Sequence, residues 1–193
     1  MDTVIAAARS DRHEAICDAV FDLLCEVGYD RMSMDAVAAR ARDSKATIYR
    51  AWPNKPDLVT ESLVHRFGGV PSAPDTGSLR GDLIALMTGA CQIANSPDGA
   101  VITGLLTAAT RNAELSRTLH QLVYEMKHPV YLAIIDGAVA RGEIPADTSA
   151  ELLHEVIHSM VLTRKLWAET GLDDDFVVHV VDDVLLPVLG KGA

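Results

Sequence analysis

Two groups of residues in the sequence have the types and the spacing that chemistry requires. The first lies between Ser33 and Lys55, where residues with hydroxyl, amine and guanidinium groups are frequent. These groups are typical of surfaces that bind phosphate. The second runs from His154 to His158 and reads H-E-x-x-H, which places two imidazoles on one helical face, as in zinc hydrolases. The two groups predict different classes of protein, a nucleic-acid-binding protein and a metalloenzyme.

The positive charge of the first group is local. Between Asp30 and Lys55 the sequence has six basic and three acidic residues, so this window carries +3 while the 193-residue chain carries −10. Screening limits the effect of an exposed charge to about 10 Å, so an acidic molecule can still bind phosphate through a basic patch. The net charge therefore does not exclude a nucleic-acid partner.

A zinc hydrolase needs more than two histidines. Catalysis would require a third ligand, a substrate cleft and a zinc-bound water, and no G-x-x-H pattern follows His158. The G-x-S-x-G nucleophile motif and the glycine-rich phosphate loops are absent as well. We therefore expect no catalytic residue, no cofactor and no resident metal. The hydrolase is kept as the alternative function, and an interface helix with partly polar histidines is favoured.

Helical periodicity dominates the elements that must position these residues. In the first helix, apolar residues recur at helical spacing between Asp11, a candidate N-cap, and Gly28, where a left-handed residue would end it. Ser33 is a candidate cap for the next helix, which would bury Met34, Val37 and Ala38. Further helices are expected at about 45–52, 54–67 (capped by Asn54), 79–95, 97–111, 113–142 (kinked or divided at Pro129), 149–170 and 173–189. With no convincing strand, the sequence predicts an all-α fold of about nine helices.

The two short helices, joined by a tight break and preceded by a longer one, have the plan of a helix-turn-helix over about 33–52. In the second of them Ile48 and Trp52 stand four residues apart and face inward. The polar side chains of this helix therefore face outward. Small residues at two positions near its N-terminus would let the helix approach a DNA groove closely. The outward residues are Lys45, Thr47, Tyr49 and Arg50, and the small ones are Ser44 and Ala46.

Several elements at fixed spacing resemble the DNA-binding region of the TetR family of bacterial transcriptional regulators. They are the Gly28-Tyr29 helix end, the Ser33-Met34 cap, the run SKATIYR from Ser44 to Arg50, and the W-P-N-K-x-x-L element from Trp52 to Leu58. The resemblance implies a dimer that places one recognition helix of each subunit in a major groove. It also implies DNA contacts from Ser33, Arg42, Ser44, Lys45, Ala46, Thr47, Tyr49, Arg50 and Lys55.

The turn before the recognition helix departs from the family pattern. Arg42 stands where the family usually has glycine, and Asp43 where it usually has an apolar residue. If the turn needs left-handed backbone, Arg42 costs roughly 1 kcal/mol or more.

The sequence divides at the glycine- and proline-rich linker 68–78. The resemblance implies a DNA-binding domain at 1–67 and an effector-binding and dimerisation domain at 79–193. Most apolar residues of a helical bundle pack in its core, but a few should line a ligand cavity. The candidates for effector binding are Met87, Cys91, Leu105, Tyr124, His128 and Trp167. The last two helices are apolar around more than one face, which favours a four-helix dimer bundle through Val156, Ile157, Met160, Val177, Val181 and Val184.

Together these features predict a ligand-responsive DNA-binding transcriptional regulator. A repressor is favoured, bound as a homodimer to a palindromic duplex operator and released by a small-molecule effector. Three cysteines without a C-x-x-C pair, no signal-peptide layout, and no apolar run long enough to span a bilayer predict a cytoplasmic protein without a membrane partner.

Overall fold

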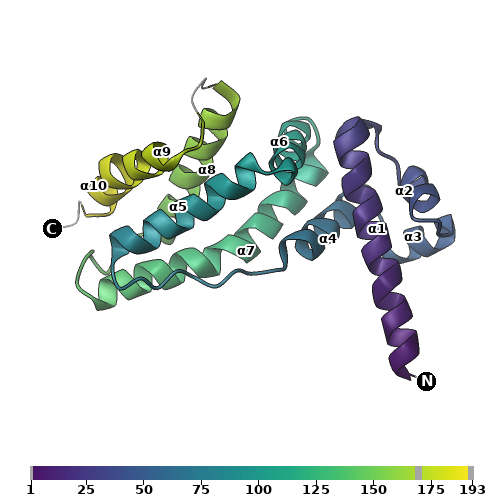
Figure 1. The fold of residues 1–193 in the computed structure, drawn as a ribbon, viewed down its shortest axis with the longest axis horizontal. Coiled ribbons are helices and arrows are strands. Elements are labelled where there is room, and N and C mark those ends of the chain that lie inside the picture. Colours follow the sequence, from purple (N-terminus) through teal and green to yellow (C-terminus); the bar gives the residue numbers. More distant parts are fainter. Residues whose placement is uncertain (1, 168–170, 191–193) are drawn as a thin grey trace. The chain divides into compact units, whose positions relative to one another are not determined.

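A computed structural model describes residues 2–167 and 171–190, and the regular elements within them are all helical (Figure 1). The helices are α1 (Asp2–Arg31), α2 (Met34–Arg40), α3 (Lys45–Ala51), α4 (Lys55–Phe67), α5 (Leu79–Asn95), α6 (Pro97–Ala109), α7 (Ala113–Ala140), α8 (Ala150–Trp167), α9 (Asp174–His179) and α10 (Leu186–Leu189). A π-helical stretch, Val180–Leu185, joins α9 to α10 without a break. These described ranges therefore hold nine continuous helical segments, as the sequence predicts.

Side-chain caps explain where many of the helices begin. Ser33 and Asn54 cap α2 and α4, which confirms two of the expected starts. At five helix starts a side-chain oxygen accepts a hydrogen bond from a main-chain N–H group, with nitrogen–oxygen distances of 2.8–3.1 Å. The pairs of cap and donor are Ser33 and Ala36, Ser44 and Thr47, Asn54 and Asp57, Ser78 and Gly81, and Asp173 and Phe176. Each cap satisfies one of the main-chain donors that a helix leaves free at its first turn.

The expected N-cap at Asp11 is wrong, and so is a division at Pro129, whereas a kink at Pro129 stays a prediction. α1 begins at Asp2, so Asp11 lies inside the helix and is not its N-cap; no glycine or proline interrupts residues 2–10, and helix formers such as alanine are frequent there. α7 runs unbroken through Pro129, so the proline does not divide it. Gly28 does interrupt the helical backbone with φ +75°, but its ψ of 169° lies outside the left-handed helical region.

The chain forms two compact units. Unit 1 comprises residues 1–69 and 100–122, and unit 2 comprises residues 70–99 and 123–193. Unit 1 therefore adds most of α6 and the first turns of α7 to α1–α4, a grouping that position along the sequence does not suggest. The reason is packing: Val101, Leu105 and Leu115 are buried in the same apolar cluster as α1.

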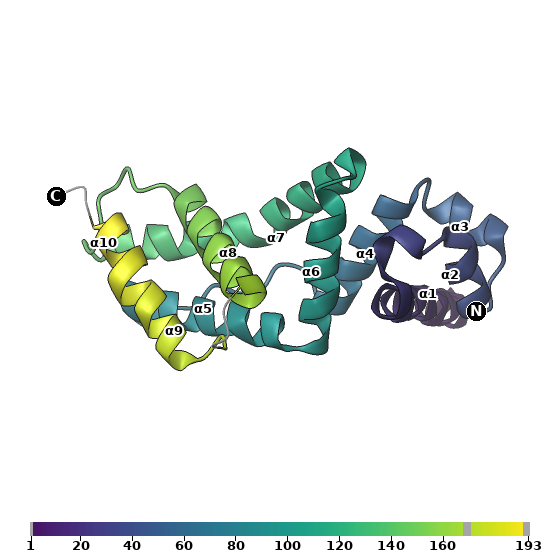
Figure 2. The same cartoon turned by 90° about the horizontal axis from the view of Figure 1, so that it is seen from above.

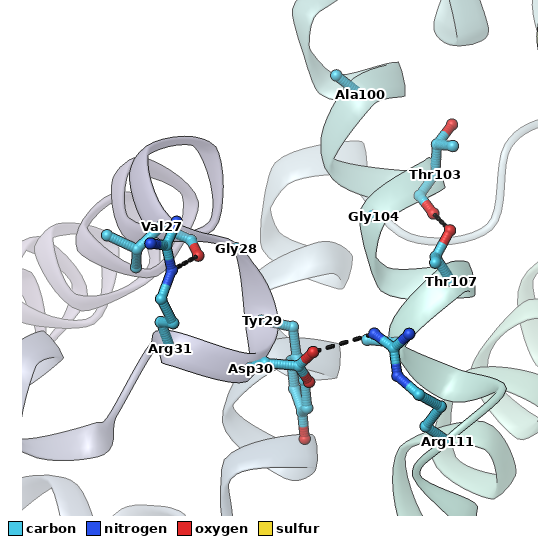
Figure 3. Close-up of a pocket in the computed structure, with 11 residues that line it drawn as sticks. Val27, Gly28, Tyr29, Asp30, Arg31, Ala100, Thr103, Gly104, Thr107 and Arg111 are labelled. Atoms are coloured by element: carbon cyan, nitrogen blue, oxygen red, sulfur yellow. Dashed lines mark hydrogen bonds and ion pairs between the residues drawn. The ribbon is translucent and has the colours of Figure 1, made fainter.

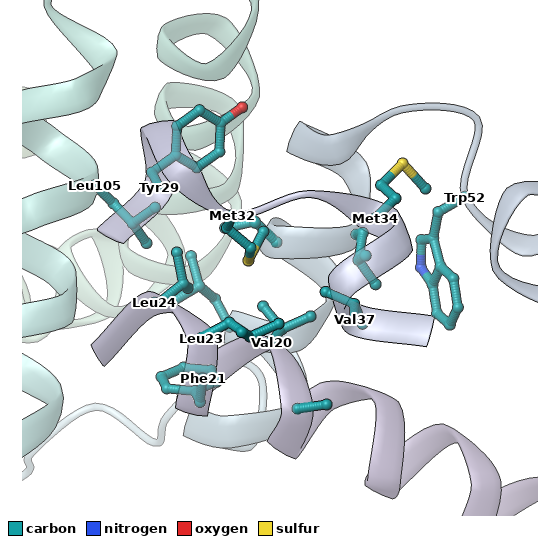
Figure 4. Close-up of a cluster of buried hydrophobic side chains, with 14 of the residues drawn as sticks. Val20, Phe21, Leu23, Leu24, Tyr29, Met32, Met34, Val37, Trp52 and Leu105 are labelled. Atoms are coloured by element: carbon teal, nitrogen blue, oxygen red, sulfur yellow. The ribbon is translucent and has the colours of Figure 1, made fainter. Parts of the chain in front are cut away.

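The core of unit 1 holds α2 and α3 against α1 and α4. Val20, Val37 and Ile48 are fully buried, and Trp52 is 4% exposed (Figure 4). Burial of Met34, Val37 and Ala38 in α2 confirms the inward face that the sequence predicts. Figures 1 and 2 both show α2 and α3 side by side next to α1, so the two short helices rest on a rigid apolar base.

Unit 2 has its own core, built from α5, the later part of α7, α8 and the terminal helical segment. Leu83, Met87, Leu153 and Val180 are fully buried in it. The terminal segment keeps the helical spacing of its valines, which confirms helix over strand. Within the two described ranges, every helix falls short of the length and apolar character needed to cross a membrane.

Candidate nucleic-acid interface

Helix α3 is anchored from below and polar on its outer side. Ile48 is fully buried and Trp52 nearly so, and the Trp52 indole Nε1 donates to Glu61 Oε2 at 2.6 Å. The opposite side presents Lys45, Ala46, Tyr49 and Arg50 as exposed residues, while Thr47 is half-buried. This confirms the inward pair that the sequence predicts and leaves hydroxyl and cationic groups facing solvent on a fixed base.

The outer side of α3 is bridged to α2 through one carboxylate. The Lys45 ammonium lies 2.5 Å from one oxygen of Asp35, and the Tyr49 hydroxyl donates to the other at 3.4 Å. The bond from Lys45 lowers the pKa of Asp35, and the same contact raises the pKa of Lys45. Two of the predicted DNA-contacting residues are thus held by a neighbour whose role the sequence does not reveal.

Ser33, Ser44 and Arg50 also lie at the exposed surface of this region. The two serine hydroxyls accept the capping N–H bonds described above, and Ser44 Oγ also lies 2.8 Å from Thr47 Oγ1. Within the described part of the chain, Arg50 has no hydrogen bond or ion pair. Its guanidinium is therefore free to meet an anion.

The turn between α2 and α3 requires left-handed backbone at Arg42, whose φ is +56°. Of the non-glycine residues that the structure describes, no other has a positive φ. The departure from the glycine of the family pattern therefore carries a strain of about 1 kcal/mol or more. The Arg42 side chain is exposed.

Asp43 is accommodated in this turn by polar partners. One carboxylate oxygen accepts the N–H of Ser44 at 2.7 Å, and the other lies 3.2 Å from Arg12 Nε in an ion pair. The Asp43 main-chain N–H donates to Ala38 at 2.9 Å. An acidic residue thus fits where the family pattern has an apolar one.

Lys55 has intramolecular partners that the sequence does not predict. Its ammonium donates to the main-chain carbonyls of Tyr29 and Met32 at 2.8 and 3.0 Å and lies 4.0 Å from the centre of the Tyr29 ring. Partial burial lowers the pKa of this ammonium. In this position two of the three N–H donors of the Lys55 ammonium close the end of α1.

The H-E-x-x-H pair lies on α8, and its histidines contact each other. The His154 and His158 rings are 4.3 Å apart, and His158 Nδ1 lies 2.9 Å from the His154 carbonyl oxygen. Burial lowers the pKa of His158 to about 4. No set of three metal-binding side chains occurs among the residues for which the structure gives side chains.

The predicted effector residues do not form one site. Met87 and Cys91 are buried in the core of unit 2, and Leu105 in the core of unit 1. Tyr124 stacks on His128 with ring centres 4.4 Å apart, and Trp167 is 83% exposed. The structure thus brings together Tyr124 with His128 and Met87 with Cys91, and Leu105 alone of the six lines a described pocket.

The pocket lined by Leu105 is small and adjoins a larger pocket of about 570 Å³. Both pockets lie in unit 1, between the last turns of α1 and helix α6. Gly28, Tyr29 and Asp30 form one wall of the larger pocket, and Gly104 and Thr107 belong to the other (Figure 3). The Asp30 carboxylate and Arg111 are joined by a 3.1 Å ion pair at its edge. The pocket is not among the sites predicted from the sequence, and the signal for it is a row of small residues at helical spacing in α6, Ala100, Gly104 and Ala108.

Three of the six predicted dimer residues belong to the core of their own subunit. Ile157, Val177 and Val181 are at most 3% exposed, so their own subunit covers nearly all of their surface. Val156, Met160 and Val184 are half-buried. The large apolar side chains that unit 2 does expose in its last helices are Leu166, Trp167, Val178 and Val188.

Comparison with known proteins gives two family matches that together cover most of the chain. Residues 16–61 match the model for bacterial regulatory proteins of the tetR family, and residues 73–184 match the model for a tetracyclin repressor-like C-terminal domain. The first match contains α2 and α3, and the second spans most of unit 2.

Individual relatives agree with these matches. The chain is 36% identical over 190 residues to a protein of Mycobacteroides abscessus named DNA-binding transcriptional repressor TetR, covering 98% of this chain and 100% of that protein. It is 34% identical over 182 residues to an uncharacterized HTH-type transcriptional regulator of Mycobacterium tuberculosis, covering 94% and 90%. A crystal structure of the TetR family transcription regulator SCO0332 superposes with a TM-score of 0.72 at 28% identity, covering 92% and 97%.

Proposed function

The chain belongs to the TetR family of bacterial transcriptional regulators and is a DNA-binding regulator of transcription, and we propose that it is a dimeric repressor of a palindromic operator. Membership of a family of regulators also sets aside the hydrolase alternative. The observation that carries the proposal is α3 itself, a helix fixed by Ile48 and Trp52 whose opposite side exposes cationic and hydroxyl groups.

Within this proposal the exposed residues divide into two kinds of contact. Ser33, Arg42, Ser44, Lys45, Tyr49 and Arg50 would bind phosphates, because amines, guanidinium groups and hydroxyls are the usual phosphate partners. Thr47 would meet base edges, and the small Ala46 would allow the close approach that a groove requires. Lys55 would act through the position of α4 and the end of α1.

Two variants distinguish these kinds of contact. Lys45→Gln should weaken a selected operator and a random duplex by similar factors, because phosphates carry no sequence information. Thr47→Val should instead relax preference at one base position per half-site, at a cost of roughly 1–3 kcal/mol on the preferred sequence alone. Fluorescence anisotropy on both duplexes measures each effect. If Thr47→Val weakened the two duplexes equally, Thr47 would not read bases.

The proposed dimer forms through unit 2. Support comes from the exposed Val178 and Val188 of the terminal segment, which lie beside the half-buried Val184 in sequence and would be covered in a helical interface. Sedimentation velocity at micromolar concentration should give a dimer for the native chain and a shift toward monomer for Val178→Asp. A native chain that sediments as a monomer would contradict the proposal.

The proposed switch is a mostly apolar effector that binds unit 2 and lowers DNA affinity. Its support is the continuity of α7, whose first turns belong to unit 1 and whose later turns belong to unit 2, so one helix joins both cores. A shift of the recognition helices by a few ångströms would prevent both from fitting grooves about 34–36 Å apart.

Linkage makes this switch testable. A compound found by thermal-shift screening should bind the protein more weakly when operator DNA is present, by the same factor by which it weakens DNA, for a coupling of roughly 1–3 kcal/mol. Calorimetric titration with and without operator measures this factor. A compound that lowers DNA affinity yet binds equally in both states would violate the linkage and show that it acts elsewhere.

A further inference from the structure

Asp35 is the carboxylate that contacts the outer side of α3. It lies in the first turn of α2, and its two oxygens receive the Lys45 ammonium at 2.5 Å and the Tyr49 hydroxyl at 3.4 Å. The pair is exposed, since the Asp35 and Lys45 side chains are 46% and 65% exposed. Solvent, ions and a nucleic acid can therefore all reach it.

The neighbouring carboxylates of this region have other partners. Asp43 accepts a hydrogen bond from the Ser44 N–H and forms an ion pair with Arg12, and Asp30 forms an ion pair with Arg111. Glu26 and Asp22 are held by Arg40. Within the part of the chain whose side chains are described, the ion pair of α3 is therefore the one between Lys45 and Asp35.

A DNA phosphate and Asp35 offer the same chemistry to Lys45. Both are oxyanions that accept charge-assisted hydrogen bonds from an ammonium and a phenol. When DNA arrives, Lys45 must exchange one anion for the other, and the carboxylate it leaves is then a bare negative charge close to the phosphate backbone. Both consequences oppose binding.

We propose that Asp35 is an internal competitor for DNA phosphate, which holds Lys45 and Tyr49 in the DNA-free protein and limits affinity for any duplex, whatever its sequence. The proposal rests on the proposed function, in that it requires Lys45 to contact DNA. Asp35 also holds the Lys45 and Tyr49 side chains in place on α3. The same residue therefore limits DNA affinity and orders the side chains that would contact DNA.

A double-mutant cycle tests the competition. The variants are Asp35→Asn, Lys45→Gln and the combination, with binding to random and selected duplexes measured by anisotropy at several salt concentrations. An exposed ion pair of this kind corresponds to roughly a twofold to fivefold factor in an equilibrium. Asp35→Asn should therefore strengthen binding to both duplexes at least that much, and the gain should shrink as salt rises.

The cycle also requires that the gain depend on Lys45. In the Lys45→Gln background, Asp35→Asn should give a gain smaller by roughly the same twofold to fivefold factor, because no ammonium remains to be released. Asp182→Asn is the matched control: it removes one charge from an exposed pair with Arg80 in unit 2. Its effect on DNA affinity should be smaller than that of Asp35→Asn. Thermal unfolding of each variant checks that the fold is retained.

The outcomes separate this inference from the function beneath it. If Lys45→Gln weakens DNA binding while Asp35→Asn behaves like Asp182→Asn, the competition is wrong and the DNA surface stands. If Asp35→Asn gives the same gain with and without Lys45, Asp35 only repels DNA and does not compete for Lys45. If Lys45→Gln has no effect on either duplex, the proposed contact of α3 with phosphate fails, and the inference fails with it.

Discussion

Helix α3 and the valine-rich terminal segment of unit 2 use their side chains in opposite ways. On α3 a single large residue, Ile48, is buried within the helix, and five of its seven residues are exposed. In the terminal segment Val177, Val180 and Val181 are all taken into the core of the subunit. Helix α3 is held by few buried side chains and leaves most of its surface exposed. The terminal segment buries these valines in the core of its own subunit.

The difference shows that exposure decides which residues are available to a partner. Polar residues at the surface of α3 can bind a second molecule without leaving the apolar core. Residues of the terminal segment can do so only where the subunit leaves them uncovered, as at Val178 and Val188. The following predictions alter residues in or near these regions of unit 1 and unit 2, and they are ordered by the size of the expected effect.

The largest effect is expected at Val181, which is fully buried. Val181→Asp places a carboxylate in an apolar core and should cost about 4 kcal/mol or more, enough to unfold unit 2. Val70→Asp, at a valine of unit 2 that is 56% exposed, is the matched control and should change stability by less than about 1 kcal/mol. Urea unfolding followed by circular dichroism measures both. Equal losses would mean that Val181 is not the core residue described.

The second effect is a loss of stability in acid through His158, which has a pKa lowered to about 4 by burial, with His154 and Lys127 acting in the same direction. Since an unfolded histidine has a pKa of about 6.5, the unfolded chain binds a proton between pH 6.5 and 4 that the folded chain excludes. The free energy of unfolding should therefore fall by about 2–3 kcal/mol from pH 6.5 to 4.

His158→Gln should flatten this dependence, and His120→Gln, at an exposed position, should leave it unchanged. Urea unfolding at a series of pH values measures the slope. A dependence that survives intact in His158→Gln would assign it to other groups.

The third effect concerns Lys55, which closes the end of α1 through the carbonyls of Tyr29 and Met32. Lys55→Met keeps much of the side-chain volume but leaves both carbonyls without this donor, so unit 1 should lose about 1–3 kcal/mol of stability. Arg50→Met, at an exposed residue of α3, should cost little. If Lys55→Met unfolded like the native chain but bound DNA more weakly, Lys55 would be a phosphate contact, as its position in the sequence suggests.

The smallest effect is a gain. Arg42→Gly removes the strain of a left-handed residue at φ +56° and should raise stability by about 1 kcal/mol. Arg42→Ala keeps the strain while removing the guanidinium, so the difference between the two variants isolates the backbone contribution. Thermal unfolding distinguishes them. Identical melting temperatures for glycine and alanine would show that the turn does not demand left-handed backbone.

The sequence was sufficient for the parts of the fold that local patterns determine. Ser33 and Asn54 cap their helices and Ile48 and Trp52 face inward as predicted, because capping chemistry and helical spacing depend on residues only a few positions apart. The strained turn at Arg42 was also foreseen, since few residues other than glycine adopt that backbone.

The rest depends on contacts between distant segments. Tertiary packing brings Lys55 to the carbonyls of Tyr29 and Met32, and it brings Asp35 to the side chains of α3. Spacing along the chain does not encode these contacts. The valines of the terminal segment show the same limit: their pattern predicts a helix apolar on several sides, but not which side its own subunit covers. For the same reason the predicted effector residues fall in two cores and on the surface, and the pocket between α1 and α6 was not anticipated.

The central claim is that the exposed side of α3 reads a particular duplex. It is tested most directly by selecting bound sequences from a random pool and then measuring the affinity of the native chain for the selected palindrome and for random DNA at physiological salt. We predict tighter binding to the palindrome by at least about 10³-fold, with a large part of that ratio lost in Thr47→Val. Equal affinity for selected and random DNA would contradict the account.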